Sequence, residues 1–256
     1  MFRTARSLRW AAWATLVVGV VYLGLGIWGI SSAASYNPFE PINWAQLMQN
    51  DIEHFWRDIT VNTAYFALHI VTICAILAIG SRAALKHPTR AILATAFLAV
   101  SVLFAAMQPL WNNLLTILPG RMARAGTDDS LRQALVHLYQ SNVLLSPLLS
   151  WGVLAFGAVG LVFLGWALLD QSPRTAYAAL LAGASYALFI GVATQISFAA
   201  SMRGTFNRGL LLSVTTLAAI LPAVTLLFAG TWLRSEARAT EAVEQPPAAR
   251  AKAAGA

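Results

Sequence analysis

The chain has 256 residues, of which 58% are hydrophobic and 11% are charged, with a formal net charge of +7. Soluble proteins carry about 25% charged residues, so this composition predicts a protein that uses lipid as its solvent. The basic residues are scattered through short connections, which argues against a nucleic-acid-binding surface. Cys74 is the single cysteine, which excludes an intrachain disulfide and CxxC redox chemistry.

Six apolar segments follow one another along the chain, each about long enough to cross the roughly 30 Å hydrocarbon core of a bilayer. They contain no Asp, Glu, Lys or Arg, and their only histidine is His69. The sequence therefore predicts an all-α, polytopic membrane protein in which residues 1–233 form one domain. The expected transmembrane helices are residues 10–30, 61–80, 91–111, 143–169, 176–200 and 209–233.

The first apolar segment follows three arginines and precedes small residues at positions 32–34, so it also resembles a secretory signal peptide. A signal-peptide core has about 7 to 15 residues, whereas this segment has 21 and ends near Trp28, a suitable interfacial anchor. We expect the helix to be retained, with cleavage as the alternative.

Basic residues in the connections predict the orientation, because Lys and Arg are enriched on the cytoplasmic side of a membrane. Residues 81–90 hold three basic and no acidic residues, whereas residues 31–60 hold only Arg57 against four acidic residues. Both termini are therefore expected in the cytoplasm. Residues 201–208 oppose this assignment, since Arg203 and Arg208 would lie outside.

Two amphipathic helices are expected in the long outer connections. In residues 42–59, apolar side chains recur at helical spacing between charged ones, which is typical of a helix lying on the membrane surface. In the other connection, Thr127 is a suitable N-cap, and Leu131, Leu135 and Leu138 form an apolar stripe. Residues 234–256 are rich in Ala, Pro and charge, which predicts a disordered cytoplasmic tail.

The second transmembrane segment carries a polar stripe, because its polar residues advance by three or four positions and share one helix face. Other segments hold polar residues at the same predicted depth, so a polar outer vestibule is a coherent hypothesis. Its candidate ligand-binding residues are Asp58, Asn62, Tyr65, His69, Gln108, Asn112 and Gln195. The alternative is that neutral His69 only hydrogen-bonds a neighbouring helix.

No signature of catalysis or of a cofactor stands out. His54 and Asp58, with Glu53 beside them, form at most a partial metal site, and His69 has no second buried histidine to share a haem. No GxSxG motif occurs, and no carboxylate lies at membrane depth to carry a coupled proton. We therefore predict no catalytic residue, metal or cofactor.

The layout resembles the bacterial six-helix membrane proteins catalogued as domain of unknown function 4386. The likeness rests on the arginine start before a Gly-rich segment at 11–29, the long outer connection, the run from Leu138-Tyr139-Gln140 through residues 151–169, and the turn with Pro173-Arg174. It implies an integral protein of the bacterial cytoplasmic membrane with undefined activity. No functional residue is carried over from it.

These observations favour a non-catalytic scaffold, accessory or regulatory subunit that binds a partner through its outer helices. Membrane lipids and a second membrane protein are the expected partners, and nucleic acid is not. Two alternatives stay open: a small-molecule carrier or channel that uses the vestibule around His69, and a membrane enzyme acting on a lipid or quinone.

Overall fold

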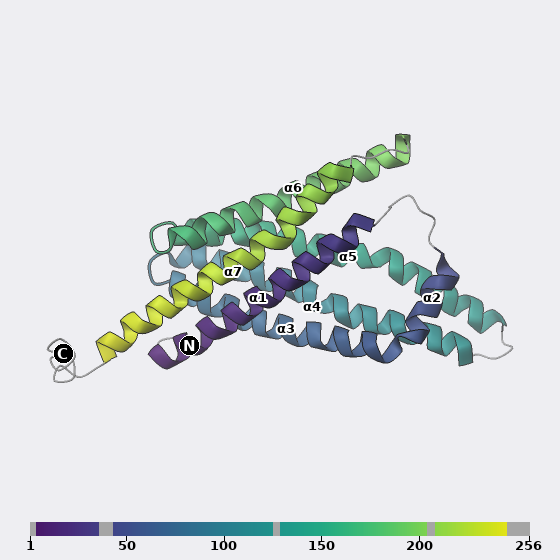
Figure 1. Ribbon diagram of the computed structural model, residues 1–256, viewed down its shortest axis with the longest axis horizontal. Helices are drawn as coiled ribbons and strands as arrows, with labels where there is room; N and C mark the ends of the chain where they lie inside the picture. Colours follow the sequence, from purple (N-terminus) through teal and green to yellow (C-terminus); the bar gives the residue numbers. More distant parts are fainter. Residues whose placement is uncertain (1–3, 36–42, 125–128, 204–207, 245–256) are drawn as a thin grey trace.

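The computed structural model describes residues 4–35, 43–124, 129–203 and 208–244, and all elements within these ranges are α-helices. The elements are α1 (Ala5–Ser35), α2 (Trp44–Glu53), α3 (Phe55–Ala83), α4 (Pro88–Arg124), α5 (Asp129–Leu168), α6 (Pro173–Arg203) and α7 (Arg208–Glu244) (Figure 1). Six of them, all except the ten-residue α2, are long and apolar enough to cross a membrane. The predicted all-α, polytopic fold class is confirmed.

The six long helices form a ring in which each helix packs against two others, in the order α1, α7, α6, α5, α4, α3 and back to α1. The contact between α1 and α3 is the sparsest of these pairs. The start of α1 and the end of α7 lie at one end of the ring, called here the terminal end, and α2 lies at the opposite α2 end (Figure 1). Toward the α2 end, the group α1, α6 and α7 diverges from the group α3, α4 and α5.

The hydrophobic core lies in the terminal half of the ring and consists largely of small residues. A Cβ atom on Gly160 of α5 would lie only 2.8 Å from the backbone nitrogen of Leu98 in α4. Gly183 of α6 lies equally close to α5, because its Cβ would be 2.9 Å from the carbonyl oxygen of Ala158. Small residues permit such close approach of helices in lipid, so the terminal half is tightly packed.

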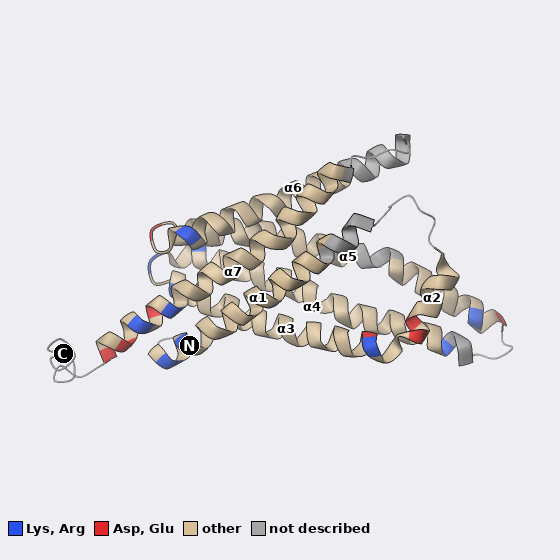
Figure 2. Ribbon diagram, in the orientation of Figure 1, with Lys and Arg blue, Asp and Glu red and all other residues tan. Residues whose placement is uncertain are grey.

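The turns at the terminal end are joined by polar contacts. His87 Nε2 lies 3.0 Å from an oxygen of Asp170, and Gln171 Nε2 donates to the carbonyl of Ala83 at 3.2 Å. The hydrogen bond from His87, helped by the charge of nearby Lys86, lowers the pKa of the Asp170 carboxyl below its ordinary value. Figure 2 shows that charged residues gather at the two ends of the ring and leave its middle uncharged, the pattern expected of a membrane-spanning bundle.

The helix predicted at 42–59 differs from the structure, because it is interrupted at His54, and residues 55–59 belong to α3. The apolar side of α2 faces protein, since Trp44, Leu47 and Met48 pack against the buried Tyr139 of α5. The Tyr139 hydroxyl donates to Asp51 Oδ2 at 2.6 Å, while burial raises the pKa of the Asp51 carboxyl. The first part of the predicted stripe is therefore a docking face within the chain, whereas Ile52 and Trp56 are exposed.

The second predicted interfacial helix is the beginning of α5, and α4 likewise continues to Arg124 past Pro109 and Pro119. The two extensions stabilise each other, because the Trp111 indole nitrogen donates to the carbonyl of Asn142 at 3.1 Å and Leu118 packs against Tyr139. Leu135 of the predicted stripe packs into this cluster, whereas Leu131 and Leu138 are exposed.

The prediction of disorder from residue 234 was wrong for residues 234–244, which continue α7. Ion pairs hold this extension: Arg9 of α1 lies 2.5 Å from Glu241, and Arg82 of α3 lies 2.6 Å from Glu236. Charged residues that cannot form a core can still order a helix by pairing with charges on its neighbours. Residues 245–256 lie outside the described part of the chain.

Candidate functional site

A cavity of about 640 Å³ lies inside the ring and is lined by all six long helices. Along α3 its lining runs from Val61 to Gly80, which is about 28 Å at 1.5 Å per residue. At the α2 end, the lining residues Val61, Trp28 and Asn112 are exposed, so the cavity is open there. At the other end, the lining residues Ile79, Gly80 and Leu164 are buried, so the cavity is blind.

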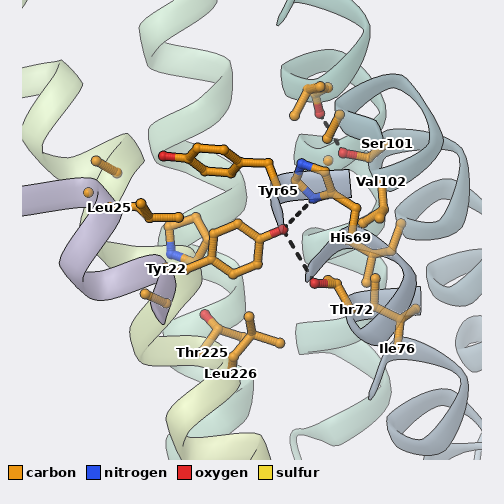
Figure 3. A pocket seen from close by; sticks show the side chains of 18 of the residues that line it. Tyr22, Leu25, Tyr65, His69, Thr72, Ile76, Ser101, Val102, Thr225 and Leu226 are labelled. Carbon is orange, nitrogen blue, oxygen red and sulfur yellow. Dashed lines mark hydrogen bonds between the residues drawn. The ribbon is translucent and has the colours of Figure 1, made fainter. Parts of the chain in front are cut away.

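A cluster of Tyr22, His69 and Thr72 lies at mid-depth (Figure 3). His69 and Thr72 are three residues apart on α3 and therefore share a face, and Tyr22 reaches them from α1. The Tyr22 hydroxyl lies 2.7 Å from His69 Nδ1 and 3.3 Å from Thr72 Oγ1. This cluster connects α1 and α3 across the sparsest contact in the ring.

Only one of the two ring nitrogens of His69 takes part in this cluster. Nδ1 faces the Tyr22 hydroxyl, while Nε2 has no hydrogen-bond partner among the described residues. If the tyrosine donates to Nδ1, the neutral ring carries its proton on Nε2, and in the other tautomer Nε2 is an acceptor. In both cases His69 contributes an unused hydrogen-bonding atom to the cavity at mid-depth.

The mouth of the cavity is the more polar part. Asn62, Tyr65 and Asn112 line it, and Gln108 donates from Nε2 to Ser150 Oγ at 2.6 Å. Slightly deeper, Ser101 donates to the carbonyl of Val153 at 2.7 Å. These bonds tie α4 to α5, so their side chains form a fixed wall.

The deep part of the cavity is mostly apolar, and the hydroxyls of its lining residues Thr95 and Thr225 donate to carbonyls of their own helices. Ile76 and Ile79 of α3, Leu98 of α4, Leu161 and Leu164 of α5, and Leu226 of α7 line it. None of the described lining residues is Asp, Glu, Lys or Arg. The cavity therefore combines a polar mouth, a hydrogen-bonding middle and an apolar blind end, without any fixed charge.

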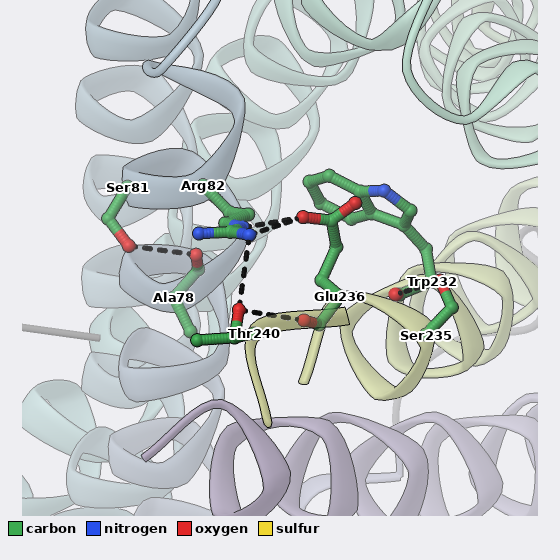
Figure 4. A network of polar contacts seen from close by, with 7 residues as sticks. All are labelled: Ala78, Ser81, Arg82, Trp232, Ser235, Glu236 and Thr240. Atoms are coloured by element: carbon green, nitrogen blue, oxygen red, sulfur yellow. Dashed lines mark hydrogen bonds and ion pairs between the residues drawn. The ribbon is translucent and has the colours of Figure 1, made fainter. Parts of the chain in front are cut away.

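Beyond the blind end, a polar network joins α3 to α7 (Figure 4). Arg82 Nε donates to Glu236 Oε2 at 2.7 Å, and a second nitrogen of the same guanidinium lies 3.4 Å from Thr240 Oγ1. The side chains of Arg82 and Glu236 are 19% and 32% exposed, so the pair is partly shielded from water. It bridges the two helix groups beyond the blind end.

Five of the seven predicted site residues line the cavity: Asn62, Tyr65, His69, Gln108 and Asn112. Asp58 does not, because it lies at the start of α3 with its carboxylate 2.9 Å from Arg57. Gln195 belongs to α6, but its side chain lies outside the described part of the structure.

Sequence reasoning missed Tyr22 of α1 and Tyr186 of α6, which complete the lining from across the ring. Each lies in the interior of an apolar segment, where Tyr22 is the lone tyrosine and Tyr186 is accompanied by Tyr177, and that position was the available signal. Among the described residues, no three His, Cys, Asp or Glu side chains come together as a metal site.

Comparisons of the chain with protein-family models, curated proteins and solved structures found no match. The resemblance to the family catalogued as domain of unknown function 4386 stays a prediction.

Proposed function

We propose that the protein is a membrane carrier for a small uncharged molecule and that the cavity is its binding site. The observation that carries this proposal is a deep cavity, open at one end of the ring and blind at the other. Small-molecule sites are typically concave, mostly apolar and supplied with a few convergent polar groups, as this cavity is.

The blind end supports a carrier rather than a channel. An open pore needs access from both ends at once, whereas a carrier exposes one central site to each end in turn. The network of Arg82, Glu236 and Thr240 joins the two helix groups beyond the blind end, where a carrier needs a gate. Loss of this network would remove one of the contacts that hold the groups together there, beside the shared apolar core.

The scaffold hypothesis relied on the outer amphipathic helices as partner-binding surfaces. Trp44, Leu47 and Met48 of α2 instead pack against α4 and α5, which leaves less of its apolar side for a partner. The carrier is therefore the function that the described geometry supports best. From the distribution of basic residues and the family resemblance, we propose a location in the bacterial cytoplasmic membrane, with both termini in the cytoplasm.

Thiol accessibility in sealed proteoliposomes tests this proposal. In a Cys74→Ser background, Ser101→Cys places a thiol at mid-depth in the cavity, and Leu103→Cys places one on the exposed, lipid-facing side of α4. A charged, membrane-impermeant methanethiosulfonate should modify Ser101→Cys at least ten-fold faster than Leu103→Cys. A carrier in exchange between two states should be modified from both sides of the membrane.

A bulky side chain in the cavity provides the matched control. Ala105→Trp fills the middle of the cavity, whereas Ala67→Trp adds the same side chain on the exposed side of α3. The first substitution should slow modification of Ser101→Cys, and the second should not. Equal rates at residues 101 and 103, or modification from a single side only, would contradict the carrier.

A further inference from the structure

We infer that the cavity binds an uncharged amphiphile, whose carbonyl or hydroxyl oxygen meets His69 and whose apolar chain fills the blind end. This inference deepens the proposed function by naming a ligand class, and it rests on the same cavity. Binding of such a molecule does not itself require transport, so the two proposals can fail separately.

The side chains that line the cavity change from polar to apolar with depth. Polar residues line the mouth and the middle, whereas the deep wall is formed by Ile76, Ile79, Leu98, Leu161 and Leu164. From His69 to Gly80, α3 rises about 16 Å, so the apolar section is long compared with a compact polar solute. Burial of an alkyl or isoprenoid chain is favourable there, and burial of a sugar or an amino acid is not.

The Nε2 nitrogen of His69 is available to a ligand. Nε2 lies where the polar and apolar parts of the cavity meet, and Nδ1 is already held by Tyr22 at 2.7 Å. The tyrosine fixes the orientation of the ring, so Nε2 is presented in one direction (Figure 3). A neutral donor or acceptor held in this way suits a hydroxyl or carbonyl oxygen of a ligand.

The described lining of the cavity contains no charged residue. An ionised headgroup at this depth needs an opposite charge or several strong hydrogen bonds, because desolvation of an ion is costly. The nearest described ion pair at the blind end, between Arg82 and Glu236, is already satisfied within the protein. The site therefore favours neutral lipids over anionic or cationic ones.

Photolabelling with matched probes tests this inference. The probes are a twelve-carbon alcohol with a diazirine in the far half of its chain and the corresponding alkyl sulfonate, which stays ionised. After irradiation of wild-type proteoliposomes, labelled peptides are mapped by mass spectrometry. The alcohol should label the deep wall, around Leu98, Leu161 and Leu226, at least five-fold more than the sulfonate, and unlabelled dodecanol should compete for these positions.

Two histidine substitutions separate recognition from general changes. His69→Phe keeps an aromatic ring but removes Nε2, so labelling of the deep wall by the alcohol should fall at least five-fold. His137→Phe makes the same change at an exposed position of α5 outside the cavity lining and should have no effect. Because the competition by dodecanol is measured on wild-type protein, the inference stays testable if His69→Phe does not fold.

The outcomes distinguish the ligand class from the carrier. Equal labelling of the deep wall by alcohol and sulfonate would overturn the neutral ligand class, while two-sided modification of Ser101→Cys would still support a carrier. Labelling confined to lipid-facing positions, or unchanged labelling in His69→Phe, would overturn the inference. Selective labelling by the alcohol with one-sided thiol access would support the ligand class and refute transport.

Discussion

Removal of the guanidinium of Arg82 is expected to open the terminal end of the ring. Arg82→Gln would leave the Glu236 carboxylate without its partner on α3 and would also remove the contact with Thr240. Exposed ion pairs contribute about 0–1 kcal/mol, and breaking a fully buried pair costs about 3–5 kcal/mol. With exposures of 19% and 32%, this pair lies between the two cases. We expect the substitution to destabilise the closed state by about 1–3 kcal/mol. This corresponds to a shift of about 5- to 150-fold in the closed-to-open equilibrium.

Distances between spin labels measure this shift. In the Cys74→Ser background, nitroxides at the exposed residues Lys86 and Arg238 report the separation of the α3–α4 turn from α7. Arg82→Gln should add a population at longer distance. The double variant Arg82→Gln/Glu236→Gln should be no more open than the single variant, as expected when two side chains act as one pair.

The ion pair between Arg9 and Glu241 supplies the control, because it joins α1 to α7 within one helix group. Arg9→Gln should leave the distance between the labels at 86 and 238 unchanged. A role of the Arg82 network as a gate would be refuted by one result. Arg82→Gln would lower the thermal stability by the expected amount, but its distance distribution would be the same as that of the wild type. The pair would then stabilise the fold without controlling access.

Two further predictions concern the packing and the turns at the terminal end. Gly160→Ala should destabilise the protein by about 1–3 kcal/mol, because the new Cβ would press on the backbone of Leu98. Thermal unfolding in detergent measures this loss. The control Gly24→Ala should not destabilise the protein, because no atom lies within 4 Å of the new Cβ. The hydrogen bond from His87 lowers the pKa of Asp170, so its stabilising effect is complete above the unfolded value of 3.8 and is lost as pH falls through the lowered pKa. In Asp170→Asn, the midpoint temperature of unfolding should therefore fall less on acidification than in the wild type. An equal fall in the two proteins would contradict this prediction.

The fold class was predictable because lipid imposes a simple requirement: every backbone polar group must be satisfied within the segment that crosses. The helix ends were less predictable. Extensions such as residues 112–124 and 234–244 are polar enough to resemble loops, and they are helical because of partners on other helices. Trp111 bonds to Asn142, and Glu241 pairs with Arg9, contacts that join residues 31 and 232 positions apart.

One wall of the candidate site was predictable from periodicity. Asn62, Tyr65 and His69 are spaced by three and four residues, so they share a face of α3 whatever the rest of the fold does. The opposite wall was not predictable, because Tyr22 joins the site only through the packing of α1 beside α7 and α3. A lone tyrosine in an apolar segment has no periodic signal of its own.

The contacts between the two helix groups differ in kind on the two sides of the ring. Where α5 meets α6, glycines allow backbone contact: the Cβ of Gly165 would lie 2.8 Å from the carbonyl oxygen of Ala176. On the opposite side, the described polar contacts between the groups are the hydrogen bonds of Tyr22 with His69 and Thr72 and the network around Arg82. Close apolar packing is lost all at once when helices separate, whereas single polar contacts can exchange for water or ligand. The α5–α6 side is therefore suited to serve as the hinge, and separation is to be measured between α3 and α7.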